Sequence, residues 1–324
     1  MMKVTLIVNG ENFNKFAEWK DTGWELIHLG NGAPDIGRIV STGADALIVD
    51  AITKIGAEII DNMPSLKLIH SHGVAFNAID IESARKAGVY VCNCAGVNAE
   101  SVAEQAVLLI LALLKKFRWG EDMVYSGRQM EAKTDCFKEG LPELGGKTVG
   151  IVGLGAIGKA LARMLRPFGC RLVYNTRSGD RREEGLTYLP LEELYSSCDI
   201  VSLHVPVTPV TTNMINSESL SLFKRGAILI NTARGELMDH AAVVDALKSG
   251  QLGGLGADTL APEPFMPDNP LLCDLPEELR HRVALSPHIA GITAGCFIRA
   301  YERVRNNIEA ICRGERPGNV VNGL

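Results

Sequence analysis

The stretch TVGIVGLGAIGKALARML, residues 148–165, decides the fold class of this chain. It contains a short apolar strand, TVGIV, then glycines in the pattern Gly-x-Gly-x-x-Gly at Gly153, Gly155 and Gly158, and then a helix. In this context the first glycine permits a tight turn and the second lets the backbone approach a pyrophosphate. The third lets helix and strand pack closely, and the helix N-terminus supplies N–H groups to the phosphates. The stretch therefore predicts a dinucleotide site.

Strands and helices alternate on both sides of this stretch. From Lys147 onward the strand-like runs are KTVGIVG, RLVYN, DIVSLHV, AILIN, GLGAD and VALSPH. In the first ninety residues they are KVTLIV, WELIHL, ALIV, LKLIH and VYVCN. Short Val/Ile/Leu-rich runs separated by helical segments are typical of parallel sheets covered on both faces. We therefore expect two α/β units, each with its own sheet.

A helix start separates the two units. Ser101 and Glu104 have the spacing of a capping box, so we expect the helix that contains AVLLILALL to begin there. The helix is apolar on nearly every side, which fits burial either between two bodies or within one domain. Both interpretations put a domain boundary near residue 98.

Length and composition exclude several classes of protein. A chain of 324 residues is long enough to form two domains, each with its own core. Its net charge of -5 and scattered Lys and Arg residues argue against a nucleic-acid partner. We find no signal-peptide pattern and no apolar run of roughly 20 residues, so we expect a cytoplasmic protein without a membrane partner. The eight cysteines include no CxxC motif, and we therefore predict no metal site and free thiols.

Three polar residues follow three successive predicted strands. Arg234 comes after AILIN, Glu263 after GLGAD and His288 after VALS. Ligands of open α/β sheets bind outside the carboxyl ends of the strands, so these side chains should meet where the dinucleotide lies. A carboxylate beside a histidine favours the protonated imidazole, an acid for proton transfer, and an arginine fork suits a carboxylate with an adjacent carbonyl. The alternatives for each residue alone are a surface ion pair, a solvated acid and a core histidine.

The segments GLGAIG, NTARGE, DTLAPEP and SPHIAG, in this order and spacing, resemble the D-isomer-specific 2-hydroxyacid dehydrogenase family. The resemblance extends over nearly the whole chain and implies an enzyme that transfers a hydride reversibly between NAD(P) and a 2-keto or D-2-hydroxy acid. Arg234 would bind the substrate carboxylate, Glu263 would hold His288, and His288 would be the acid-base catalyst. The resemblance also implies a homodimer.

The family resemblance also implies which domain each of the two units forms. It implies a flavodoxin-like substrate domain formed by residues 1–98 and 293–324, and a Rossmann dinucleotide-binding domain formed by residues 99–292. The HGVAFN segment matches a loop that binds the substrate carboxylate through backbone N–H groups, with Ala75 where the family usually has a glycine. The predicted substrate-binding residues are His72, Gly73, Val74, Ala75, Arg234 and His288, and the alternative for His72 is a plain loop histidine. The predicted cofactor-binding residues are Gly153, Gly155, Ala156, Ile157, Gly158, Asn175, Thr176, Arg177, His204, Pro206, Thr232, Ala233 and Asp258.

Two positions bear on the substrate. Phosphoglycerate dehydrogenases, which this chain also resembles, place arginines in the segments that correspond to LIVDAITK and SLKLIHSHG, and this chain has Asp50 and Ser71 there. Because an aspartate repels a phosphate dianion at short range, we expect a small unphosphorylated 2-keto acid such as glyoxylate, hydroxypyruvate or a short branched one. The alternatives are D-3-phosphoglycerate dehydrogenase and, in another class, a dinucleotide-sensing protein similar to corepressors.

The segment RLVYNTRSGDRR, residues 171–182, bears on the cofactor. NAD-binding chains place an Asp or Glu about 20 residues beyond the glycines, where it accepts from the ribose 2′-OH. This chain has Asn175, Thr176 and Arg177 at that strand end. Without a carboxylate and with Arg181 and Arg182 nearby, the segment predicts NADP. In the alternative the arginines only solvate the loop and the enzyme uses NAD.

Overall fold

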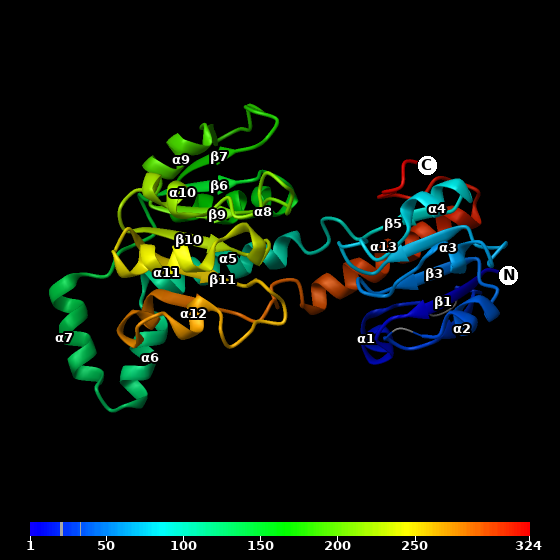
Figure 1. The fold of residues 1–324 in the computed structure, drawn as a ribbon, viewed down its shortest axis with the longest axis horizontal. Helices are drawn as coiled ribbons and strands as arrows, with labels where there is room; N and C mark the ends of the chain where they lie inside the picture. The colour runs from blue at the N-terminus through cyan, green and yellow to red at the C-terminus, as the bar shows by residue number, and fades with distance from the viewer. Residues whose placement is uncertain (20–21, 33) are drawn as a thin grey trace. The chain divides into compact units, whose positions relative to one another are not determined.

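The computed structural model describes residues 1–19, 22–32 and 34–324, and the chain divides into two compact units (Figure 1). Unit 1 comprises Met1–Asn98 and Ile292–Leu324, and unit 2 comprises Ala99–Gly291. Each has its own sheet and its own apolar core. Over the residues that the structure describes, we find no helix with the length and apolarity needed to cross a bilayer.

The sheet of unit 1 has five parallel strands in the order β2-β1-β3-β4-β5. This is the flavodoxin-like order, in which the direction of winding changes between β1 and β3. The strands are nearly continuous apolar runs because both faces of the sheet are covered. Their bounds are β1 Lys3–Ile7, β2 Glu25–His28, β3 Ala46–Val49, β4 Leu68–Ser71 and β5 Tyr90–Cys92.

Helices cover both faces of this sheet. On one face α1 (Gly10–Phe16) and α13 (Ala294–Cys312) enclose an apolar cluster with Phe13, Trp19 and Tyr301. On the other face lie α2 (Ile36–Ser41), α3 (Ala57–Ile60) and α4 (Ile81–Lys86). The C-terminal helix α13 thus completes the core that the first residues of the chain begin.

The sheet of unit 2 has seven parallel strands in the order β12-β11-β10-β9-β6-β7-β8. Winding reverses between β6 and β9, which is the doubly wound Rossmann arrangement extended by one strand. The predicted fold class is confirmed for both sheets, although β8, which has two residues, was not predicted. The bounds are β6 Thr148–Val152, β7 Arg171–Asn175, β8 Thr187–Tyr188, β9 Ile200–Leu203, β10 Ala227–Asn231, β11 Leu252–Ala257 and β12 Val283–Leu285.

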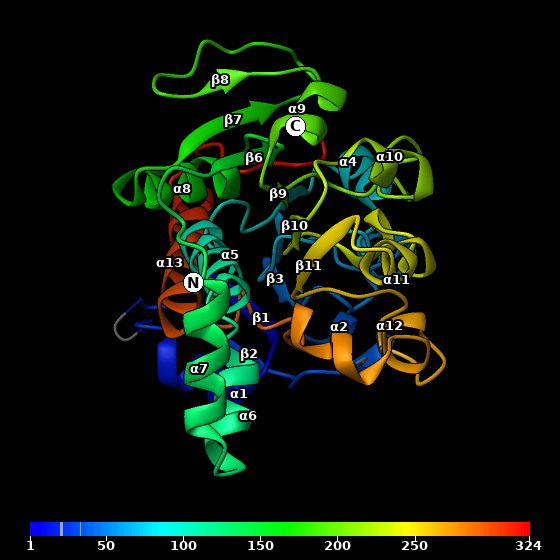
Figure 2. The same ribbon diagram turned by 90° about the vertical axis from the view of Figure 1, so that its left-hand side faces the viewer.

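The helices of unit 2 also form two layers (Figure 2). One layer consists of α5 (Ala99–Leu114) and α8 (Ala156–Leu165), which pack on each other and on the sheet. The opposite layer consists of α9 (Leu191–Ser197), α10 (Ser217–Leu222), α11 (His240–Lys248) and α12 (Pro270–Cys273). Three short 3-10 turns lie at Arg166–Phe168, Gly235–Leu237 and Glu277–Arg282.

Two further helices of unit 2 were not predicted. They are α6 (Phe117–Tyr125) and α7 (Gln129–Glu139), which form a hairpin that extends away from the sheet of this unit (Figure 1). Only Met123 of α6 and Ala132 of α7 are buried, and several large apolar side chains of the two helices remain exposed.

The predicted capping box is wrong. Helix α5 begins at Ala99, so Ser101 lies inside its first turn and does not cap it. The Ser101 hydroxyl donates instead to the carbonyl oxygen of Ala290, a bond across 189 positions of the chain. A long-range partner has replaced the local one, and the bond holds the segment that follows His288.

Candidate functional site

The three glycines of the Gly-x-Gly-x-x-Gly segment differ in what surrounds them. Gly153 has φ +98°, and a Cβ there would overlap the carbonyl oxygen of His204. A Cβ on Gly158 would overlap the carbonyl oxygen of Gly153. A Cβ on Gly155, by contrast, would have no atom within 4 Å. Gly153 and Gly158 are therefore required by internal packing, whereas Gly155 leaves open the N-terminus of α8, where a pyrophosphate would fit.

Two buried polar atoms just after the ends of β9 and β10 have no hydrogen-bond partner among the described residues. Among the residues that the structure describes, none forms a hydrogen bond with Thr232 Oγ1 or with His204 Nδ1. The other ring nitrogen of His204 lies 2.8 Å from Ser202 Oγ, and burial lowers the pKa of this histidine to about 4. Buried polar groups are rarely left unpaired, so these atoms fit a ligand with amide or hydroxyl groups. They belong to the set predicted to bind the cofactor, with neighbouring Ala233 and Pro206.

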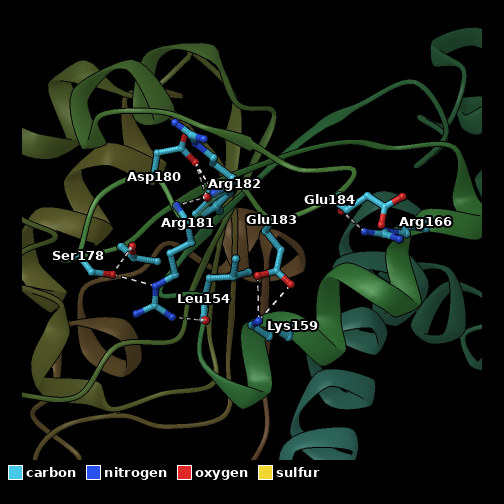
Figure 3. Close-up of polar contacts among 11 residues, drawn as sticks. Leu154, Lys159, Arg166, Ser178, Asp180, Arg181, Arg182, Glu183 and Glu184 are labelled. Atoms are coloured by element: carbon cyan, nitrogen blue, oxygen red, sulfur yellow. Dashed lines mark hydrogen bonds and ion pairs between the residues drawn. The ribbon is translucent and has the colours of Figure 1, made fainter.

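The loop after β7 is folded by its own side chains (Figure 3). Asp180 accepts from Tyr174 Oη and from the N–H of Arg182, both at 2.8 Å. Tyr174 Oη in turn accepts from the N–H of Arg181 at 2.8 Å. The bond from Arg182 holds the pKa of the Asp180 carboxyl below its usual range. Asp180 thus holds the loop in its conformation through these hydrogen bonds. A second contact is the ion pair between Glu183 of the loop and Lys159 of α8, at 2.8 Å.

Arg181 reaches the glycine segment. Its Nε donates to Ser178 Oγ at 2.8 Å and its Nη1 to the carbonyl oxygen of Leu154 at 3.4 Å, as Figure 3 shows. The predicted residues Asn175 and Thr176 use their side chains internally, since Asn175 donates to Leu189 and Thr176 to Gly179. Sequence patterns assigned Arg181 a secondary role and gave no sign of Ser178, because only the folded loop brings Arg181 to Leu154 and Ser178 to Arg181.

The structure pairs His288 with Glu263. His288 Nδ1 lies 2.8 Å and 2.9 Å from the two carboxylate oxygens, which assigns the proton to Nδ1 and leaves Nε2 to face outward. Both side chains are partly exposed. His288 has φ +55°, a conformation that non-glycine residues rarely adopt, and its N–H donates to the carbonyl oxygen of Asp258 at 2.7 Å. The pair is therefore held in place by the backbone as well as by its own bond.

The carboxylate of Asp258 is bonded to the segment that carries His288. Its side chain is buried and accepts from the hydroxyl of Ser286 and from the N–H groups of Ile289 and Ala290. These bonds enclose His288 from both sides. Asp258 therefore has the geometry of a residue that positions the histidine loop, and its predicted contact with the cofactor stays a prediction.

Arg234 lies on a loop that packs against the one carrying Glu263. A Cβ on Gly235 would overlap the backbone of Leu260 and Ala261, so only glycine allows this approach. Arg234 is exposed, with Nη1 donating to the carbonyl oxygen of Ala233 at 2.7 Å. Unit 2 therefore brings the loops of Arg234, Glu263 and His288 together at the carboxyl edge of β10, β11 and β12.

In unit 1 the predicted carboxylate loop follows β4. Ser71 Oγ donates to the carbonyl oxygen of Ala75 at 2.6 Å, and Asn93 Nδ2 to that of Val74 at 2.7 Å. Within the described part of the chain, the N–H groups of Val74 and Ala75 have no acceptor. Ala75 does not adopt a positive φ, so the loop needs no glycine there. These free donors fit a carboxylate.

The comparisons with known proteins identify the family of this chain. Residues 107–290 match the model of the D-isomer specific 2-hydroxyacid dehydrogenase NAD binding domain. A glyoxylate reductase of Thermococcus litoralis is 37% identical over 321 residues, which are 96% of this chain and 92% of that protein. The structure of a D-2-hydroxyisocaproate dehydrogenase, 28% identical, has a TM-score of 0.85 with full coverage of both chains. That of an acyclic imino acid reductase in complex with NADPH and D-Arg, 27% identical, has a TM-score of 0.78 over 99% of this chain and 100% of that one.

Three observations identify the family. Unit 2 has a Rossmann sheet with an open glycine segment, a histidine–carboxylate pair lies at the carboxyl edge of that sheet, and the similarity extends over nearly the full length of the chain. The chain is an NAD(P)-dependent oxidoreductase of hydroxy acids and belongs to the D-isomer-specific 2-hydroxyacid dehydrogenase family.

Proposed function

We propose that this enzyme reduces a small unphosphorylated 2-keto acid, such as glyoxylate or hydroxypyruvate, to the D-2-hydroxy acid with NADPH. The observation that supports the chemistry most directly is the His288–Glu263 pair, at 2.8 Å, on the edge where Gly155 leaves the phosphate position open. The similar protein of Thermococcus litoralis is named a glyoxylate reductase, which favours a short substrate.

Each polar residue has one task in this proposal. When bound, the cofactor supplies a hydride to the keto carbon. His288 donates the proton from Nε2 to the keto oxygen, while its Nδ1–H stays bound to Glu263, which holds the ring in orientation. The guanidinium of Arg234 binds the carboxylate and polarises the carbonyl, as a planar fork can. In oxidation the histidine accepts the proton instead.

A panel of 2-keto acids tests the proposal, with consumption of NADPH followed at saturating cofactor. His288→Ala should lower kcat by two orders of magnitude or more, the usual contribution of a general acid, while the Kd of NADPH stays within about twofold. The matched control is His281→Ala, because His281 is a half-buried histidine of unit 2 outside the site. An unchanged kcat in His288→Ala would exclude the proposed acid.

The preference for NADPH rests on the loop after β7. The strand end lacks a carboxylate to accept from a ribose 2′-OH, and Arg181 lies beside Leu154 with its guanidinium fixed by Ser178. The imino acid reductase of similar structure is described in complex with NADPH. We therefore propose that Arg181, with Arg177, binds the 2′-phosphate of NADP.

Cofactor kinetics test whether Arg181 causes a preference for NADPH over NADH. Wild-type kcat/KM should favour NADPH over NADH by roughly tenfold, which corresponds to about 1.4 kcal/mol. Arg181→Ala should remove most of that preference by raising KM for NADPH alone, and Asn175→Asp in addition should reverse it. Arg182→Ala is the matched control, since only its N–H contributes to the loop. A wild-type enzyme that prefers NADH refutes the assignment.

The hairpin of α6 and α7 supports the proposed homodimer. It leaves Tyr125 84% and Phe137 91% exposed, along with Phe117, Val124 and Met130. Monomers rarely expose contiguous apolar side chains of this size. We propose that a second copy of the chain covers them, so that light scattering should give twice the chain mass and Tyr125→Glu with Phe137→Glu should give a monomer. A monomeric wild-type protein would contradict this.

A further inference from the structure

A buried hydrogen-bond network holds the loop that carries Glu263. Asn269 caps α12 through its Oδ1, which accepts from the N–H of Leu271 at 3.1 Å. Its Nδ2 donates to the carbonyl oxygen of Ala261 at 2.9 Å and lies 2.7 Å from Nδ1 of His240. Asn269 and His240 are both buried. Each polar atom of the Asn269 side chain therefore has a partner, and these partners fix the orientation of its amide.

The bond to Ala261 is the polar contact on which this loop depends. Within the described part of the chain, the backbone groups of residues 259–265 form no other hydrogen bond. The remaining contacts of the loop with the core of unit 2 are apolar and come from Leu260 and Phe265. Ala261 precedes Glu263 by two positions, so the direction of the backbone that carries the carboxylate depends on the bond from Asn269.

His240 connects this network to the segment that carries Arg234. His240 is the first residue of α11, and the chain reaches it from Arg234 through the 3-10 turn Gly235–Leu237. The backbones of Gly235 and Ala261 are in close contact, because a Cβ on Gly235 would overlap the Ala261 nitrogen. Ala261 thus packs against the Arg234 segment and also accepts from an amide that the same segment orients.

The His240 ring is an acceptor in this network. Burial lowers the pKa of His240, so the ring is neutral at neutral pH. Because Nδ1 accepts from Asn269, the proton of the neutral ring is on Nε2. The reverse orientation of the Asn269 amide would place its oxygen against two acceptors, this nitrogen and the Ala261 carbonyl oxygen. The imidazole therefore keeps the Nδ2 hydrogens directed at Ala261.

We propose that Asn269 is a positioning residue for proton transfer, which fixes the loop of Glu263 and through Glu263 the ring of His288, while His240 orients the Asn269 amide. This inference rests on the proposed roles of Glu263 and His288 and extends them to two buried residues outside the set that binds substrate or cofactor. A misplacement of about 1 Å can lower a rate by up to about a hundredfold, so loss of the bond to Ala261 should lower kcat.

Asn269→Ser tests the role of the amide. A serine at this position can still cap α12, but its hydroxyl is too short to replace the bond from Nδ2 to Ala261. We expect kcat for keto acid reduction with NADPH to fall about fivefold while KM stays within about twofold. In the Glu263→Gln background the same substitution should change kcat by less than about twofold, because an effect that passes through the carboxylate is lost once the carboxylate is removed.

Asn216→Ser is the matched control. Asn216 caps α10 of the same unit, and its Nδ2 donates to the carbonyl oxygen of Asn213 at 3.0 Å. Serine there keeps a cap and removes the same kind of bond outside the site, so kcat should match that of the wild type.

Two substitutions of His240 test the other end of the network. His240→Ala removes the acceptor and should lower kcat about threefold, less than loss of the amide itself. His240→Asn should recover most of this activity, because its Oδ1 can accept in place of Nδ1. Both variants are also measured in the Glu263→Gln background, and they decide the question if Asn269→Ser does not fold.

The outcomes separate this inference from the proposed reaction. If Glu263→Gln leaves kcat unchanged, the proposed role of the histidine–carboxylate pair is wrong, and the inference fails with it. If Glu263→Gln lowers kcat and neither Asn269→Ser nor His240→Ala does, the reaction stands and the positioning role is refuted. Equal losses with and without the Glu263 carboxylate, or equal losses in Asn269→Ser and Asn216→Ser, would also overturn it.

Discussion

Protonation of His70 should destabilise unit 1 as the pH falls. His70 lies on β4 with no exposed surface, its Nδ1 2.8 Å from the carbonyl oxygen of Ser71 and its Nε2 2.9 Å from Asn307 Nδ2 of α13. Asn307 also donates to Gly318 and accepts from it, so one neutral imidazole joins the strand, the helix and the C-terminal segment. Because Nε2 accepts from an amide, a proton there would break the bond to α13.

Burial lowers the pKa of His70 from 6.5 to about 4. The unfolded chain therefore binds this proton first as the pH falls, and the contribution to stability is present above pH 6.5 and lost as the pH approaches 4. The full difference corresponds to about 3 kcal/mol. Between pH 7.5 and pH 5 the linkage relation gives a loss of about 2 kcal/mol.

The variant His70→Asn provides the comparison, because asparagine does not titrate and its amide can donate to Ser71. The free energy of unfolding in urea is measured from pH 7.5 to pH 5 in a Trp119→Phe background. The remaining tryptophans, Trp19 and Trp24, belong to unit 1, so their fluorescence reports that unit. The wild type should lose about 2 kcal/mol more than the variant over this range. If the free energies of unfolding of the wild type and of His70→Asn differ by a constant amount from pH 7.5 to pH 5, the role assigned to His70 is refuted.

Three further predictions concern the site. Glu263→Gln should lower kcat about tenfold in steady-state assays, because a neutral amide holds the Nδ1–H of His288 less strongly than a carboxylate does; wild-type kcat would show that the pair is only structural. Arg234→Lys should raise KM for the keto acid and lower kcat together, since an ammonium lacks the planar fork, and a change in Tm alone would contradict this. Gly158→Ala should lower the free energy of unfolding by about 1–3 kcal/mol because its Cβ overlaps backbone, whereas Gly155→Ala should leave it within about 0.5 kcal/mol and weaken NADPH binding. Melting curves and cofactor titrations check this pair, and equal effects on stability would be inconsistent with it.

The amino-acid sequence by itself determined the sheets, the glycine segment and the order of the residues at the strand ends. Strands, turns and helix starts follow from patterns within a few positions, and in parallel sheets the carboxyl ends of neighbouring strands must meet at one edge. That is why Glu263 and His288 could be expected to approach each other, and they lie 2.8 Å apart.

Only the tertiary structure decided which partner each polar side chain takes. Ser101 looked like a helix cap and instead bonds Ala290, the Asp258 carboxylate bonds the histidine loop, and Arg181 reaches the glycine segment. A cavity of unit 1 lined by Asp50 likewise combines loops that follow four separate strands with the start of the C-terminal helix. A side chain chooses among competing partners by their distance and burial, and both depend on segments remote in the chain, which no local pattern encodes.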